Sequence, residues 1–269
     1  MPAEDSPLLL EVTDHIARLT LNRPAKLNAI DDRMLVLLSQ YLARIETDPD
    51  IRAVLVQGRG RAFCAGADLE VVAQSMKSGS SFRAWLDEWH RVFRLLEHCP
   101  KPTVAAVQGL AYAGGLELTQ VCDVVVAAKD AWFGDQHAKL GLFPGGGSTQ
   151  RLPRLIGARR ARWMLLSGEP ISAIEAREFG MVHQVVECND LDSAAHKCAN
   201  QLARQSVSAN AAIKRAAIEG ADLELDAGLE LERELAVSHM TGPDPQIGLR
   251  AFRERTSPIF TGLEESEPS

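Results

Sequence analysis

Residues 101–118 read KPTVAAVQGLAYAGGLEL, and this stretch combines a buried strand, a glycine turn and the start of a helix. The apolar run Thr103–Val107 has the length and composition of a strand buried on both faces. A loop leads from it to Gly114 and Gly115, and Leu116–Val121 is predicted as a short helix. A valine-rich strand, Asp123–Ala128, follows. This order of strand, loop, helix and strand is typical of an α/β protein with parallel pairing.

The same order precedes this stretch. Ala53–Val56 is predicted as a short buried strand, and a glycine-punctuated loop follows over Gly58–Asp68. A helical stretch then extends to about Cys99, with an interruption around Ser78–Ser81. Further upstream we predict a hairpin with strands at Leu8–Asp14 and His15–Leu21. A helix follows it, which is capped by Asp31 or Asp32 and ends at Pro49.

The C-terminal third is predominantly helical by pattern. A short strand is expected at Val182–Val186, and helices follow at Leu191–Gln205, Asn210–Glu219 and Leu223–His239. No linker rich in Pro, Gly or Ser separates two autonomous domains. We therefore expect a core over residues 1–190 and a helical region over residues 191–269 that packs on the core or on another subunit, with a polar tail at 264–269.

Composition excludes several classes of protein. The 269 residues are 46% hydrophobic and 24% charged, which is ordinary for a globular chain. The net charge of −7 and the pI near 5.6 argue against nucleic-acid binding. We expect no membrane span, no signal peptide and a cytoplasmic location. The five cysteines are scattered without a CxxC pair, so we expect reduced thiols and no zinc site.

The glycine loops do not match the common nucleotide or nucleophile motifs. Gly58 and Gly60 lack the third glycine of a dinucleotide fingerprint, and there is no GxxxxGK[ST] phosphate loop. Ser148 lacks the second glycine of a GxSxG elbow, so a serine-hydrolase triad is not supported. Glycine must serve another purpose here.

Two loops place small residues between a strand and a helix, at Cys64–Asp68 and Gly109–Gly115. Each can expose a backbone N–H at the positive end of a helix dipole. Two such amides that converge would stabilise an enolate oxygen. Either loop alone is better explained as a tight turn. The pair, with the acid Glu117 in the first turn of the second helix, favours a catalytic site.

The chain resembles the enoyl-CoA hydratase/isomerase (crotonase) family along nearly its whole length. Ordered motifs carry the resemblance: Leu21–Pro24, Leu27–Ala29, Ala62–Leu69, Lys101–Gly109, Ala113–Leu118, Cys122-Asp123, Phe133-Gly134, Leu140–Gly147 and Thr149–Leu152. The resemblance implies an α/β fold, the crotonase (ClpP-like) spiral of ββα units. It also implies a helical C-terminal region that mediates trimers, often paired into hexamers.

The resemblance also implies roles for individual positions. The oxyanion amides would be those of Ala67 and Gly114, and Glu117 matches the first of the two catalytic glutamates of the hydratases. In the substrate-binding part, the carbonyl of Ala65 would meet the adenine of coenzyme A. Lys26 and Leu27 would lie along the cofactor portion of the substrate, and we count Asp68 as a candidate there, although its position also suits a structural role at the start of a helix.

The sequence departs from the hydratases at the second catalytic glutamate. That residue lies four positions past the phenylalanine of the Phe-Gly motif, where this chain reads Phe133-Gly134-Asp135-Gln136-His137. A carboxylate and an imidazole can divide acid and base roles, because histidine exchanges protons near neutral pH. The alternative is that His137 is a bystander beside a single working acid. Asp135 could orient His137 or cap the following turn.

The implied enzyme is an acyl-CoA lyase, and hydration of a 2-enoyl-CoA to a 3-hydroxyacyl-CoA through an enolate is the first choice. The alternatives are a C–C bond hydrolase that opens the ring of a cyclic 3-oxoacyl-CoA, or an enoyl-CoA isomerase. A non-catalytic RNA-binding relative is disfavoured by the acidic pI. No cofactor is expected apart from the coenzyme A of the substrate, and no nucleic-acid partner.

Two further sets of apolar residues have no assigned role. Trp85, Trp89 and Phe93 recur at four-residue spacing, so they are core residues or walls of an acyl pocket. Leu225, Leu229 and Leu235 form stripes on the C-terminal helices that a small subdomain would not fully bury. Such surface normally marks an interface, which agrees with the expected homotrimer or dimer of trimers.

Overall fold

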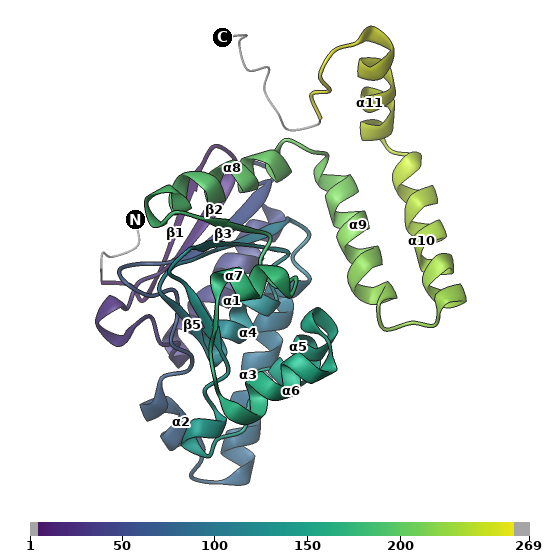
Figure 1. Cartoon of the computed structure of the whole chain (residues 1–269). Helices are drawn as coiled ribbons and strands as arrows, with labels where there is room; N and C mark the ends of the chain where they lie inside the picture. Colours follow the sequence, from purple (N-terminus) through teal and green to yellow (C-terminus); the bar gives the residue numbers. More distant parts are fainter. Residues whose placement is uncertain (1–4, 261–269) are drawn as a thin grey trace.

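Two sheets organise the protein in the computed structural model, which describes residues 5–260 (Figure 1). The larger sheet has six strands in the order β1-β2-β3-β4-β6-β9, and the smaller has three in the order β5-β7-β8. The polar tail expected at 264–269 and the end of the region 191–269 lie outside the described residues. No helix among the described residues is both long and apolar enough to cross a membrane.

The larger sheet begins with the predicted hairpin, in which Asp14 and His15 form the turn with φ of 51° and 62°. Only β1 and β2 pair antiparallel, and each later neighbour is parallel. The strands of this sheet are β1 (Leu8–Thr13), β2 (Ile16–Leu21), β3 (Ala53–Gly58), β4 (Thr103–Val107), β6 (Val124–Ala128) and β9 (Gln184–Val186). The predicted strands therefore form, with ends that differ by at most two residues.

The apolar runs of the parallel strands are explained by burial on both faces of the sheet. Val54 and Val56 of β3 pack in one hydrophobic cluster, while Leu55 packs in a second one on the opposite face. The first cluster is closed by α1 (Asp32–Thr47) and α3 (Gly79–Glu97), and the second by α8 (Leu191–Ala203). Parallel sheets covered on both sides lack the alternating pattern of half-exposed strands.

The smaller sheet was not predicted, because its strands have only two or three residues and leave no periodic signal. They are β5 (Leu110–Tyr112), β7 (Trp132–Gly134) and β8 (Ile171–Ser172). Two of the long strands are each followed by a short strand and then an α-helix, and β4, β5 and α4 (Gly114–Gln120) form one such ββα unit. The unit is repeated by β6, β7 and α5 (Ser148–Ile156), which is the repeat implied by the resemblance.

The remaining core helices connect or flank these units. They are α2 (Leu69–Ser75), α6 (Ala158–Ser167) and α7 (Ala173–Glu178), with single 3₁₀ turns at Pro24–Lys26, Ala138–Leu140 and Cys188–Asp190. The break between α2 and α3 covers residues 76–78, so it begins before the predicted interruption at Ser78–Ser81 and overlaps it only at Ser78. Asp31, one of the two predicted caps of α1, accepts the backbone N–H of Met34 at 2.8 Å.

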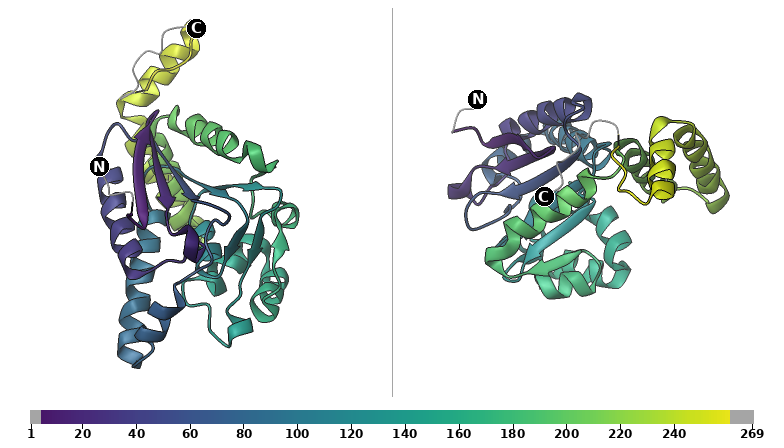
Figure 2. Two further views of the ribbon diagram at one scale, coloured as in Figure 1. Left: turned by 90° about the vertical axis from the view of Figure 1, so that its left-hand side faces the viewer. Right: turned by 90° about the horizontal axis from the view of Figure 1, so that it is seen from above.

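Three C-terminal helices stand away from the core as an arm, which consists of α9 (Val207–Gly220), α10 (Leu225–Met240) and α11 (Pro243–Glu254) (Figures 1 and 2). Helix α9 begins three residues before the predicted start, because Ser206 caps it through the N–H of Ala209 at 3.0 Å. Helix α11 was not predicted. Its prolines occupy the first turn, where the missing N–H groups have no intrahelical acceptor.

Candidate active site

A cavity of about 540 Å³ opens where α2, α3 and α4 meet the loop after β7. Seven of the eight predicted site residues border it: Lys26, Ala65, Ala67, Asp68, Gly114, Glu117 and His137. Leu27 does not border the cavity. The fold therefore gathers candidates from four separate segments of the sequence around one space.

The amides of Ala67 and Gly114 lie side by side at the wall of this cavity. A Cβ atom built on Gly114 would come within 3.2 Å of the Ala67 nitrogen and 2.7 Å of the Trp89 ring, so only glycine allows this approach. Within residues 5–260 neither N–H donates a hydrogen bond to a protein acceptor. Two adjacent free donors, each at or near the start of a helix, can bind an anionic oxygen.

Long-range backbone pairing fixes the direction of these two amides. The loop that carries Ala67 is held by Ile30, which donates to the Gly66 carbonyl and accepts from the Asp68 N–H, both at 2.8 Å. Ala113 precedes Gly114 with φ of 48° and ψ of −118°, which is strained for a residue with a side chain. Its N–H donates to the Gly134 carbonyl at 2.9 Å, and this bond holds the strained turn.

Glu117 projects from the first turn of α4 and is only 2% exposed. One carboxylate oxygen accepts the N–H of Ser148 at 3.3 Å, and the Gly146 N–H is a second donor. Burial raises the pKa of Glu117, and the nearby charge of His137 and the two amides only partly oppose the shift. A raised pKa favours the protonated form of a carboxyl, which is the form that acts as a general acid.

His137 follows β7 and is paired with Asp135, which is completely buried. The His137 Nδ1 lies 2.8 Å from Asp135 Oδ1, and a carboxylate accepts, so Nδ1 is the donor and Nε2 remains available. Burial lowers the pKa of His137, but the hydrogen bond and charge of Asp135, together with Glu117, outweigh it and raise the pKa. Of the two readings of Asp135, orientation of His137 has direct geometric support.

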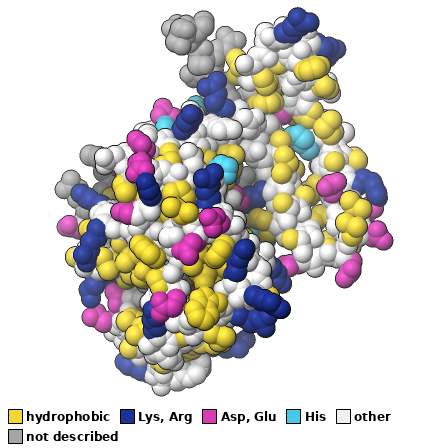
Figure 3. Space-filling view, viewed as in Figure 1, with side chains coloured by type: hydrophobic (Ala, Val, Ile, Leu, Met, Phe, Trp, Pro, Cys, Tyr) yellow, Lys and Arg dark blue, Asp and Glu magenta, His cyan; other side chains and the backbone are white. Residues whose placement is uncertain are grey.

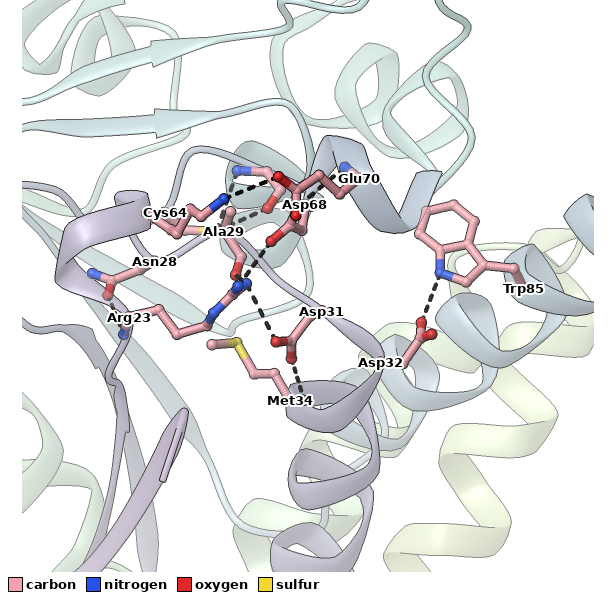
Figure 4. A network of polar contacts seen from close by, with 12 residues as sticks. Arg23, Asn28, Ala29, Asp31, Asp32, Met34, Cys64, Asp68, Glu70 and Trp85 are labelled. Atoms are coloured by element: carbon pink, nitrogen blue, oxygen red, sulfur yellow. Dashed lines mark hydrogen bonds and ion pairs between the residues drawn. The ribbon is translucent and has the colours of Figure 1, made fainter. Parts of the chain in front are cut away.

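A polar network supports the loop at the start of α2 (Figure 4). The Asp68 carboxylate accepts from Arg23 at 2.8 Å and from the Glu70 N–H at 3.1 Å, so it caps α2. Burial would raise the pKa of Asp68, but the bonds from Arg23 and the Glu70 amide outweigh it and lower the pKa. Asp68 borders the cavity, yet its oxygens are engaged in holding the Ala67 loop.

The other substrate-binding candidates lie along the same loop. Leu27 has φ of 50°, and its carbonyl accepts the Ala65 N–H at 2.9 Å, so it positions Ala65 from behind the cavity wall. Among the described residues, the Ala65 carbonyl accepts no hydrogen bond. Lys26 is exposed at the rim with its ammonium 3.4 Å from Glu70. This part of the site offers a free carbonyl and a cation at the cavity mouth.

Two features of the site were missed or left open by the sequence. Trp89 both belongs to the hydrophobic core and borders the cavity. The four-residue spacing in the sequence had left a core position and a pocket wall as alternatives for this residue. Gly146 lies against the carboxylate, since a Cβ built on it would be 2.1 Å from Glu117 Oε2. The glycine triplet at 145–147 was a visible signal, but the residue that it faces depends on the tertiary structure.

Comparison with known proteins agrees with this geometry. Residues 11–263 match the enoyl-CoA hydratase/isomerase family. The chain is 37% identical over 257 residues to the 2,3-dehydroadipyl-CoA hydratase of Escherichia coli (strain K12), covering 96% of this chain and 99% of that protein. It is 36% identical over 260 residues to the 1,2-epoxyphenylacetyl-CoA isomerase of the same organism, covering 95% and 98%.

A solved structure shows the same fold. The crystal structure of an enoyl-CoA hydratase from Bacillus anthracis superposes with a TM-score of 0.90 at 34% sequence identity, covering 96% of this chain and all of that one. The expected crotonase spiral is therefore confirmed, and so is the family implied by the motifs. The chain belongs to the enoyl-CoA hydratase/isomerase (crotonase) family and is an enzyme of that family.

Proposed function

We propose that this enzyme adds water to a 2-enoyl-CoA and forms a 3-hydroxyacyl-CoA. The observation that carries the proposal is the meeting of two free amides, a buried carboxyl and a paired imidazole in one cavity. The amides of Ala67 and Gly114 would bind the thioester oxygen. Negative charge develops on that oxygen when a nucleophile adds to the β-carbon, and preorganised N–H donors stabilise it.

The acid and base roles follow from the environments of the two side chains. Neutral His137 would take one proton from water through Nε2 as the water oxygen bonds to the β-carbon. Protonated Glu117 would give its proton to the α-carbon as the enolate collapses to the thioester. The proton on His137 then returns to Glu117, so atoms and charge balance after one turnover. Only protons and one water molecule move, and the steps require no redox cofactor.

The pKa directions suit this division. Asp135 raises the pKa of His137, which makes the imidazole a stronger base and stabilises the imidazolium formed when water is deprotonated. Burial raises the pKa of Glu117, which favours the protonated form that an acid requires. Environments that separate the roles of two titratable groups are a general means of assigning acid and base.

The coenzyme A portion would lie along the loop from Lys26 to Asp68. We propose that the free carbonyl of Ala65 accepts a hydrogen bond from the adenine and that Lys26 meets a phosphate at the rim. Leu27 and Asp68 would act indirectly, because their own polar groups hold Ala65 and Ala67 in place. The acyl chain would then enter the apolar part of the cavity beside Trp85 and Leu86.

The test is a substrate screen that separates hydration from the other reactions of the family. Straight-chain, branched and aryl 2-enoyl-CoA thioesters are incubated with the purified enzyme, and products are identified by mass. We expect a gain of one water with the thioester intact. Double-bond migration without a change in mass would support an isomerase instead, and ring opening of a cyclic 3-oxoacyl-CoA to a free acid would support a C–C hydrolase.

A further inference from the structure

One buried polar group at the site has no partner in the protein. Trp89 is 2% exposed, and among the described residues its indole Nε1 makes no hydrogen bond. A buried indole N–H usually finds an acceptor, because leaving it unpaired is unfavourable. Trp89 borders the cavity, and its Nε1 lies near Gly146 and Glu117, which border it too, so an acceptor bound at this place would pair the group.

The Trp89 indole lies beside both Glu117 and the oxyanion amide of Gly114. A Cβ built on Gly146 would lie 2.5 Å from Trp89 Nε1 and 2.1 Å from Glu117 Oε2, so these two atoms flank the same small space. Farther along the same edge of the ring, Cζ2 and Cη2 would lie 2.7 and 2.9 Å from a Cβ on Gly114. The N–H is therefore on the carboxylate side of the oxyanion amides.

The neighbouring tryptophan shows that this arrangement is specific to Trp89. Trp85 lies one turn earlier on α3 and also borders the cavity, but its Nε1 donates to Asp32 Oδ1 at 3.1 Å (Figure 4). The rings of Trp85 and Trp89 are 5.3 Å apart, and those of Trp89 and Phe93 are 4.8 Å apart. Packing between them fixes the Trp89 ring, so its N–H keeps one direction.

We propose that the Trp89 N–H binds the oxygen atom that is added to the β-carbon, first as water and then as the 3-hydroxyl of the product. This inference rests on the proposed hydration. A water molecule beside Glu117 would donate its two hydrogens to the carboxyl and to His137. One lone pair accepts from Trp89, and the other points at the β-carbon. The donor thus orients the nucleophile, and correct orientation lowers the barrier of the addition.

Ligand binding offers a test that does not depend on turnover. Dissociation constants of 3-hydroxybutyryl-CoA and butyryl-CoA are measured in a Glu117→Gln background, where conversion is slow. Adding Trp89→Phe keeps an aromatic six-membered ring and removes the indole N–H. We expect weaker binding of 3-hydroxybutyryl-CoA by about three- to tenfold, the usual effect of one hydrogen bond. Butyryl-CoA lacks the oxygen, so its dissociation constant should stay within twofold.

Trp85→Phe is the matched control, because the N–H of Trp85 that it removes is bonded to Asp32 and is not available to the added oxygen. It should leave the ratio of the two dissociation constants unchanged. Equal weakening of both ligands by Trp89→Phe, or no weakening of either, would overturn the proposal. In the otherwise unaltered enzyme, Trp89→Phe should lower kcat and leave KM for the enoyl-CoA nearly unchanged, since that substrate has no oxygen at the β-carbon.

A measurement on the unsubstituted chain covers the case in which Trp89→Phe does not fold. Indole ¹⁵N–¹H resonances are assigned through substitutions at the other three tryptophans. Addition of 3-hydroxybutyryl-CoA should shift the Trp89 indole proton, and butyryl-CoA should not. The two proposals can fail separately. If no enoyl-CoA is hydrated, but 3-hydroxybutyryl-CoA still shifts the Trp89 resonance and is still bound more weakly by Trp89→Phe, the proposed reaction is wrong and the Trp89 oxygen site stands. If hydration occurs without this shift and this weaker binding, only the Trp89 inference is wrong.

Discussion

At the scale of single residues, Glu117 provides the most direct test. Glu117→Gln preserves the shape of the side chain and an oxygen that can accept the Ser148 N–H, but it removes the ionisable carboxyl. We expect turnover to fall by at least ~10²-fold, as is usual for a general acid or base, with little change in folding or coenzyme A binding. Steady-state rates on the true substrate, with Glu88→Gln as a surface control, check this; near-normal turnover contradicts the assignment.

His137 predicts a pH dependence with a defined sign. Its neutral form is the proposed base, so activity should fall as pH drops through its pKa. An unperturbed imidazole would place that limb near ~6.5. Because Asp135 raises the pKa of His137 in spite of its burial, we expect the limb above that value. His137→Glu should shift the limb toward carboxylate values.

Two variants distinguish the effect of the Asp135 charge on the pH profile from the effect of the His137 imidazole on the rate. Asp135→Asn removes the carboxylate that raises the pKa of His137, so the acidic limb should move to lower pH. His137→Ala should remove the limb and most of the rate. Profiles of kcat against pH are the measurement. If His137→Ala leaves both the rate and the profile unchanged, the histidine is a bystander and Glu117 acts alone.

At the scale of elements, the start of α2 combines stability with the geometry of the oxyanion site. Asp68 caps the helix and pairs with Arg23, so Asp68→Ala should lower the free energy of unfolding by about 1–2 kcal/mol. The pKa of Asp68 is lowered in the folded state, so this contribution is present at neutral pH and is lost as pH falls below the ordinary aspartate range.

Denaturant unfolding at neutral and acidic pH measures the Asp68 effect. Asp87→Ala, at an exposed position inside α3, is the matched control because it neither caps a helix nor borders the cavity. The Asp68→Ala variant should also lose turnover, since the Ala67 amide is no longer held. Full stability at pH 7 would show that the cap and ion pair contribute nothing measurable.

At the scale of the whole molecule, the arm formed by α9–α11 has no core of its own. Neither α9 nor α10 contains a fully buried residue, and hydrophobic side chains show on its surface (Figure 3). Leu225 is 75% exposed and Phe252 is 82% exposed. Exposed apolar surface of this kind normally marks an interface. We therefore propose that the arm packs against other copies of the chain, in a trimer or a dimer of trimers.

Light scattering at micromolar concentration tests the assembly. The native chain should have three or six times the subunit mass. The double substitution Val237→Asp with Phe252→Asp places charge on the arm and should shift the protein toward monomers. Val36→Asn, at an exposed apolar position on α1, serves as the control. A stable monomer of the native chain would contradict the proposal.

The domain division at residue 190 stays a prediction, although α8 packs on the core sheet.

The sequence by itself determined the elements whose signals are local. Apolar runs predicted the long strands, a polar cap predicted the start of α1, and ordered motifs predicted the family. The missed elements lacked such signals. The strands β5, β7 and β8 are too short to be periodic, and α11 begins with prolines that resemble a helix breaker.

Only the tertiary structure decided how the site is arranged. The amides of Ala67 and Gly114 come together through pairing with Ile30 and Gly134, which are distant in sequence. Trp85 and Trp89 lie four residues apart on one helix, yet the Trp85 indole N–H is bonded to Asp32 and the Trp89 indole N–H is buried without a partner among the described residues. Amide direction, burial and pKa depend on neighbours from other segments, and a linear pattern does not contain those contacts.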